Sequence, residues 1–139
     1  MTLVPDGYRY ARKISLRWKD NDVYGHVNNV EYYSFFDTVI NEFLILEGGL
    51  DIHAGDAIGL CAESHCSFKA PVVFPGTIIA ALRTAHVGRS SVRYDVGLFD
   101  DDGTQIAEGS FVHVFVGRAD RRPTPIPPQI KQRLEEIAR

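Results

Sequence analysis

The 139-residue sequence has few residues of several kinds: two cysteines, one methionine, one tryptophan, and no long run of apolar or basic residues. A membrane-spanning helix needs about 20 consecutive apolar residues, so the sequence predicts none. The formal net charge of -3 and the lack of a basic run disfavour nucleic-acid binding as the main role. Because residues 1–12 lack the apolar core of a signal peptide, a cytoplasmic location is expected.

The two cysteines, Cys61 and Cys66, fall in a segment with strand-like alternation. An odd separation places strand residues on opposite faces, so no internal disulfide is expected. With His65 between them, the fragment resembles a metal cluster, but alternation separates Cys66 from the other two side chains and a fourth ligand is missing. The sequence therefore predicts buried or partly exposed thiols and no metal site.

The sequence does contain a polar segment, residues 17–29, followed directly by a long apolar stretch. Over residues 30–47, apolar side chains recur at the spacing of one helical face. Asn28 or Asn29 is a suitable N-cap, and Gly48 ends the pattern. The polar segment is therefore expected at a helix N-terminus, where unpaired N–H groups and the helix dipole favour an anion or a polarised carbonyl.

Strand patterns surround this helix. Ile14, Leu16 and Trp18 alternate with polar residues before it. Turn-forming residues separate four strand candidates after the helix, at 58–69, 77–87, 91–99 and 104–116. The last candidate is apolar on both faces, which is typical of a central strand.

The tail differs from the rest of the chain. Residues 118–139 are rich in proline and end in a short amphipathic helix, which is expected to be peripheral. One strand, one apolar helix and a run of four strands indicate an α+β fold, taken as a single domain over residues 1–139. A curved sheet wrapped around the helix would cover its apolar surface, and the open sheet edges favour pairing between copies.

The segment from Asp22 to Asn29, with the aromatic helix after it, resembles the hot-dog-fold acyl-CoA thioesterases, specifically the 4-hydroxybenzoyl-CoA thioesterase group. The resemblance covers nearly the whole chain and includes residues 68–71, 87–91 and 122–134. It implies a five-stranded antiparallel sheet wrapped around one long helix, assembled as a homodimer or homotetramer. It also implies hydrolysis of an acyl-CoA without a metal or cofactor.

The same resemblance implies roles for residues of the polar segment. In that group the second carboxylate of an Asp-x-Asp pair is catalytic, and this role falls on Asp22. A backbone N–H at the helix start polarises the thioester carbonyl, and this role falls on Asn29. His26 is a further candidate, although a structural loop histidine is an equal interpretation, and Asp20 is taken as structural. The sequence does not choose between a nucleophilic and a general-base role for Asp22.

Substrate-binding residues are expected at the pocket mouth and along the helix. A CoA thioester carries phosphates, which basic side chains bind. Arg89, with Ser90 beside it in a turn, is the first candidate, and Lys69 is another. Tyr32, on the aromatic helix face, would line an acyl pocket. Solvated surface charges and a core aromatic residue are the alternative interpretations.

Several alternatives stay open. Plant acyl-carrier-protein thioesterases share the Asp-x-x-x-His-Val-Asn-Asn pattern, and hot-dog hydratases or dehydratases also act on acyl thioesters with an Asp-His pair. A non-enzymatic acyl-CoA-binding role is a further alternative. The last is a calcium-binding module, because residues 20–31 nearly fit an EF-hand loop, with Gly25 at the sixth place and Glu31 at the twelfth. Tyr24 at the fifth place breaks that pattern.

Overall fold

The computed structural model describes residues 3–139, so the first two residues of the chain lie outside the described part. Its elements are β1 (Tyr10–Ser15), the short 3-10 helix η1 (Trp18–Asp20), α1 (Asn29–Leu46), β2 (Ala57–Phe68), β3 (Thr77–Val87), β4 (Ser91–Phe99), β5 (Gln105–Gly117) and α2 (Pro128–Glu136). This order confirms the prediction of one strand, one long helix and a run of four strands. Within residues 3–139, neither helix combines the length and apolar character needed to cross a membrane.

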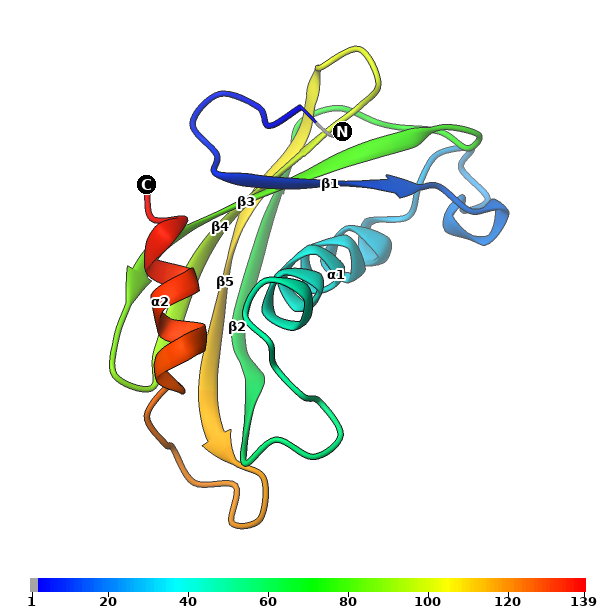
Figure 1. The fold of residues 1–139 in the computed structure, drawn as a ribbon. Helices are drawn as coiled ribbons and strands as arrows, with labels where there is room; N and C mark the ends of the chain where they lie inside the picture. Colours follow the sequence, from blue (N-terminus) through cyan, green and yellow to red (C-terminus); the bar gives the residue numbers. More distant parts are fainter. Residues whose placement is uncertain (1–2) are drawn as a thin grey trace.

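The strands form one five-stranded antiparallel sheet in the order β1-β3-β4-β5-β2. β5 lies between β4 and β2, as its two apolar faces predicted, and β1 and β2 form the two edges. Figure 1 shows the sheet curving behind α1, which lies across its hollow side. The predicted α+β fold, with a five-stranded antiparallel sheet wrapped around one long helix, is therefore confirmed.

The apolar face of α1 packs onto the sheet. Its buried side chains are Tyr32, Phe35, Phe36, Val39, Ile40, Phe43 and Leu44. Tyr33, which follows Tyr32 on this helix, is 38% exposed. A Cβ at Gly109 of β5 would overlap the Phe36 ring, so the glycine allows the helix to approach the sheet closely.

The edge strand β2 contains a β-bulge between Cys61 and Glu63. Beyond it, Cys66 lies opposite Gly109 of β5, while Cys61 lies opposite His113. Those two β5 residues share a face, so both cysteines lie on that face. The prediction that the cysteines lie on opposite faces is wrong, because the bulge adds one residue to the alternation. Both thiols are free; Cys61 is exposed and Cys66 is buried.

The C-terminal helix α2 packs on the same side of the sheet as α1, over β3 (Figure 1). The Thr84 hydroxyl of β3 donates to the Leu134 carbonyl at 2.9 Å. The tail pattern suggested a peripheral helix, but the side chains of Ile130 and Leu134 are buried in the main hydrophobic core. The proline-rich tail therefore closes one end of the core.

Candidate functional site

The polar segment between η1 and α1 folds as a small hairpin. A β-bridge joins Asn21 to Val27. Inside it, the Asp22 N–H donates to the His26 carbonyl at 3.0 Å, and the Gly25 N–H donates to the Asp22 carbonyl at 3.2 Å. Gly25 has φ +90°, a left-handed conformation that favours glycine, so this residue type permits the tight turn.

Helix α1 begins directly after this hairpin, with Asn28 as its N-cap. The Asn28 side-chain oxygen accepts the Val30 N–H at 2.9 Å, and the Asn28 carbonyl accepts the Glu31 N–H at 3.0 Å. Of the two N-cap candidates in the sequence, the structure thus selects Asn28. No acceptor for the Asn29 N–H is found among residues 3–139. This N–H is therefore the first-turn donor left open for a ligand.

A pocket of about 240 Å³ opens beside the start of α1. Its lining residues are His26, Val27, Asn29, Tyr32, Phe68, Lys69, Ala70 and Pro71. The rings of Tyr32 and Phe68 meet edge to face with centroids 5.1 Å apart and supply apolar surface. The structure therefore brings together four predicted site residues: His26, Asn29, Tyr32 and Lys69. Phe68 was not singled out, although it adjoins Lys69 in the sequence.

Asp22 lies in the hairpin beside this pocket but is not one of its lining residues. Its carboxylate oxygen Oδ1 accepts the Tyr24 N–H at 2.8 Å, and the residue is half-buried. Its main-chain N–H binds the carbonyl of His26, which does line the pocket. Asp22 is thus joined through its main chain to a residue of the pocket wall, while its carboxylate accepts a hydrogen bond within the hairpin.

His26 and Lys69 each have a polar partner at the pocket, and Tyr32 is buried there. Nδ1 of His26 lies 3.2 Å from the Val27 carbonyl; donation from Nδ1 leaves Nε2 as an acceptor. Nζ of Lys69 lies 3.2 Å from a Glu108 carboxylate oxygen, in an exposed ion pair. Burial raises the pKa of the Tyr32 hydroxyl, with a smaller contribution from Cys66, so this hydroxyl is protonated at neutral pH.

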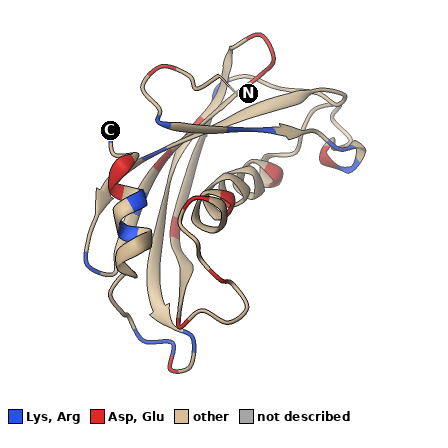
Figure 2. Cartoon of the chain, in the orientation of Figure 1, with Lys and Arg blue, Asp and Glu red and all other residues tan. Residues whose placement is uncertain are grey.

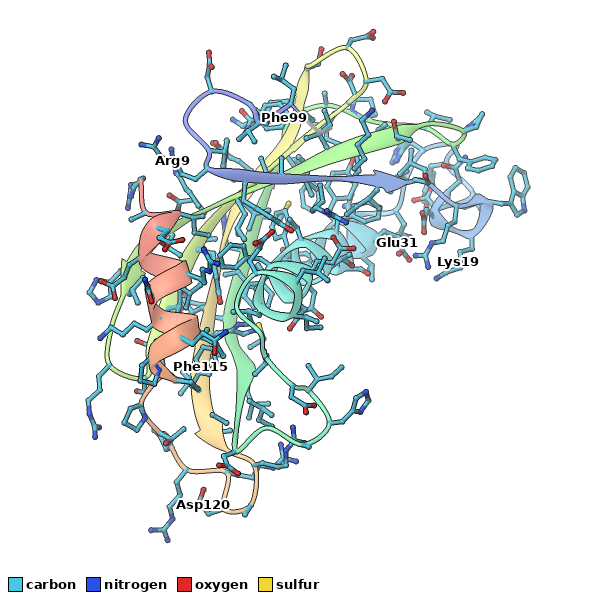
Figure 3. The ribbon with its side chains drawn as sticks, in the orientation of Figure 1. Arg9, Lys19, Glu31, Phe99, Phe115 and Asp120 are labelled. Carbon is cyan, nitrogen blue, oxygen red and sulfur yellow. The ribbon has the colours of Figure 1, made fainter. Side chains whose placement is uncertain are left out.

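Arg89 and Ser90 lie away from this pocket within one chain. The Ser90 carbonyl accepts the Phe115 N–H at 2.7 Å, whereas the Lys69 N–H donates to the Ile106 carbonyl at 2.8 Å. These two β5 residues are separated by about 30 Å at the usual rise of a strand. Figure 3 shows Phe115 at the end of the sheet away from the start of α1. The structure therefore does not bring these two predicted residues to the pocket of their own chain.

The geometry of the segment does not support the calcium-binding alternative. The residue at the first EF-hand place, Asp20, is fully buried and its carboxylate binds Arg17. Before it come β1 and η1 instead of the helix that an EF-hand requires. Across residues 3–139, no three His, Cys, Asp or Glu side chains are grouped so that they could hold a metal ion.

Comparisons with known proteins agree with the fold. A family model described as the thioesterase-like superfamily matches residues 16–134. Curated proteins give no match. Among solved structures, the chain is similar to the PA5185 protein of Pseudomonas aeruginosa, with 49% identity and a TM-score of 0.92 over 94% of this chain and 92% of that chain. The PA2801 protein of Pseudomonas aeruginosa is 30% identical, with a TM-score of 0.80 over 88% of this chain and 95% of that chain.

A more distant likeness links the fold to a structure with a bound ligand. A thioesterase from Thermus thermophilus, complexed with coenzyme A and zinc, is 24% identical, with a TM-score of 0.78 over 92% of this chain and 98% of that chain. At this identity the likeness shows the fold alone. The matches confirm the hot-dog fold, and the family model supports thioesterase activity. Because that model covers α1, the hairpin before it and the whole of β2 to β5, the chain belongs to the thioesterase-like superfamily.

Proposed function

We propose that this protein hydrolyses an acyl-CoA thioester to a free acid and CoA, in the manner of the 4-hydroxybenzoyl-CoA thioesterase group that its hairpin resembles. The observation that carries the proposal is the open Asn29 N–H at the pocket, with the Asp22 carboxylate in the adjoining hairpin. Thioester hydrolysis needs a donor for the developing oxyanion and a group that attacks or activates water. These two residues supply both functions.

In the proposed reaction, the thioester carbonyl oxygen accepts the Asn29 N–H, and the dipole of α1 favours its developing negative charge. As a general base, Asp22 takes a proton from water while the water oxygen attacks the carbonyl carbon. The tetrahedral intermediate then breaks its C–S bond and expels CoA as a thiolate, which takes up a proton. As a nucleophile, Asp22 itself displaces the thiolate to form a mixed anhydride, which water then hydrolyses. His26 would orient the water through Nε2.

The pocket lining indicates how the substrate would bind. The Tyr32 and Phe68 rings would contact the acyl group. Lys69 at the pocket would bind a CoA phosphate, and its exposed pairing with Glu108 leaves it free to exchange partners. The proposed chemistry uses protein groups and water and requires no metal or cofactor.

We also propose a homodimer, or a homotetramer built from two such dimers, with a shared site. β2 is an edge strand, and its outer backbone groups face no other strand within residues 3–139. Antiparallel pairing of β2 with β2 of a second copy would place the start of one strand beside the end of the other, where the pocket lies. Arg89 of the partner subunit and Ser90 of the partner subunit would then lie at the end of the joined sheet that holds the pocket.

The direct test is release of free CoA thiol from a panel of acyl-CoAs with short, long and aromatic acyl groups. The same acyl groups on a carrier protein form a second arm, which distinguishes the two thiol carriers. We expect CoA release with saturation kinetics. A hydratase or a binding protein would release no thiol, and this outcome would contradict the proposal.

Substitution of Asp22 by Asn connects the activity to this site. The change keeps the side-chain shape and its acceptor oxygen but removes the charge, so we expect kcat to fall about 10²–10⁴-fold with the fold intact. Asp51→Asn is a matched control, because Asp51 also accepts backbone N–H groups in a loop, from His53 and Ala54. Equal turnover in wild type and the Asp22 variant would remove Asp22 from the mechanism.

A further inference from the structure

The carboxylate of Asp20 is fully buried, unlike the half-buried Asp22 in the same segment. Its Oδ2 accepts the Arg17 main-chain N–H at 2.7 Å. Its Oδ1 accepts from the Arg17 guanidinium, with Nη2 at 3.0 Å and Nε at 3.3 Å. A buried carboxylate is stable only when it is paired and hydrogen-bonded, and Arg17 satisfies both conditions.

The main chain of Asp20 joins the two segments that flank the hairpin. Its carbonyl accepts the N–H of Asn28, the N-cap of α1, at 2.9 Å. Asp22 follows shortly after Asp20 in the chain, and Asn29 follows directly after Asn28. Asp20 therefore connects the segment that carries the proposed catalytic carboxylate with the segment that carries the proposed oxyanion donor.

The Arg17 guanidinium extends this connection to the helix. Its Nη2 lies 3.4 Å from a carboxylate oxygen of Glu31, in the first turn of α1. Figure 2 shows basic and acidic segments adjoining each other at this end of the molecule, and Figure 3 shows Glu31 and Lys19 there. The guanidinium thus binds the start of the hairpin and the start of the helix together.

We propose that Asp20, paired with Arg17, is a positioning residue that sets the separation and direction between the Asp22 carboxylate and the Asn29 N–H. This inference rests on the proposed thioesterase function. A displacement of about 1 Å between catalytic groups can cost about 100-fold in rate. A slightly loosened hairpin would therefore reduce kcat more than it reduces folding stability or substrate binding.

The test uses Asp20→Asn, which keeps the shape of the side chain and an acceptor for the Arg17 N–H but removes the charge that holds the guanidinium. We expect kcat to fall about 10-fold or more, while KM stays within about two-fold and the melting temperature stays close to that of wild type. Glu42→Gln is the control, because it breaks an Arg12–Glu42 pair of 3.0 Å that joins β1 to α1, just as the Arg17–Glu31 pair joins the segment after β1 to α1. We expect this control to keep the wild-type kcat.

A second measurement distinguishes positioning from general loop stability. If Asp20 acts through Asp22, Asp20→Asn should cause no further loss of kcat in an Asp22→Asn background. If the fold-losses of kcat from the two substitutions multiply in the double variant, the inference is overturned. An Asp20→Asn enzyme with wild-type kcat would also overturn it. If Asp20→Asn does not fold, Arg17→Lys carries the test, because lysine keeps the charge but cannot form the forked contact. The same fall in kcat and the same non-additivity are then expected.

Turnover by the wild type distinguishes failure of the proposed function from failure of the positioning role. A wild-type protein that releases no CoA from any thioester would contradict the proposed function, and this inference with it. An active wild type with an unaffected or additive Asp20 variant would overturn only the positioning role. An active wild type with a non-additive loss supports both.

Discussion

The hydroxyl of Tyr94 on β4 lies 3.2 Å from Nδ1 of His113 on β5, and both side chains are buried. The His113 ring also packs edge to face against Phe111 and Phe115. Removal of the imidazole from water lowers the pKa of His113 to about 4, and burial raises the pKa of the Tyr94 hydroxyl. The pair is therefore neutral at pH 7 and forms a polar contact inside an aromatic cluster.

This pair predicts a pH-dependent stability. The lowered pKa means that the unfolded chain binds more protons at His113 than the folded chain between pH 6.5 and about 4. The contribution of the neutral histidine to the free energy of unfolding is complete above pH 6.5 and is lost as the pH falls through this window. We expect the free energy of unfolding to fall by about 2 kcal/mol between pH 7 and pH 5 because of this residue.

Urea denaturation at both pH values measures the effect, with His113→Phe as the comparison. Phenylalanine cannot titrate and fits an aromatic surrounding, so the variant should lose about 2 kcal/mol less than wild type on acidification. At pH 7 the variant should itself be destabilised by about 1 kcal/mol, because the buried Tyr94 hydroxyl loses its partner. Identical pH dependence in the two proteins would contradict the assignment.

The open N–H of Asn29 can be removed without removing the helix. Proline is well tolerated at the first helical position, and the extended conformation of Asn28 (φ -66°, ψ 140°) suits a residue before proline. We expect Asn29→Pro to fold with an unchanged circular dichroism spectrum and to lose about 10²–10³-fold in kcat. Asn29→Ala keeps the N–H and should retain most activity. Equal rates for the two variants would argue against an oxyanion donor at this position.

Arg118 fixes the loop after α1 through backbone carbonyls. Its Nε donates to the Gly55 carbonyl at 2.6 Å, and Nη2 donates to the Ile52 carbonyl at 2.7 Å. Arg118→Ala should reduce the free energy of unfolding by about 1–3 kcal/mol, since these carbonyls lose charged donors. Arg122→Ala, at an exposed position nearby, should change it by less than about 0.5 kcal/mol. Chemical denaturation of both variants makes the comparison.

Substitution of Leu134 tests whether the C-terminal helix contributes to the hydrophobic core. Its side chain is 0% exposed, so Leu134→Ala should leave a cavity and cost about 2–5 kcal/mol of unfolding free energy. Arg133→Ala removes a half-exposed partner of Glu136 on the same helix and should cost less than about 1 kcal/mol. A tail that merely lay on the surface would give similar small losses for both changes in thermal or urea unfolding.

The candidate site was partly predictable because some of its parts depend on short stretches of chain. The N-cap, the glycine turn and the start of α1 follow from neighbouring residues, so the segment from Asp22 to Asn29 already indicated an open helix N-terminus. The burial of Asp20 could not be predicted from neighbouring residues in the same way. Its only local signal is Arg17 three residues earlier, a pairing that requires the chain to turn at η1.

Other site features depend on strand register, which local patterns do not fix. Lys69 and Ser90 both looked like substrate contacts, yet they lie near opposite ends of β5 within one chain. Phe68 became part of the pocket because the end of β2 faces Tyr32 of α1. Such contacts join residues far apart in the sequence, and only the assembled sheet brings them together.

Local patterns specify the helix, the strand candidates and the polar hairpin, because apolar periodicity, capping residues and turn residues act over a few neighbours. Which faces those elements bury depends on how they pack together in three dimensions. A single bulged residue in β2 moved Cys66 to the face of Cys61, and the docking of α2 on β3 brought Leu134 into the core. Register and docking are set by the packing of the whole sheet, and no short segment carries that information.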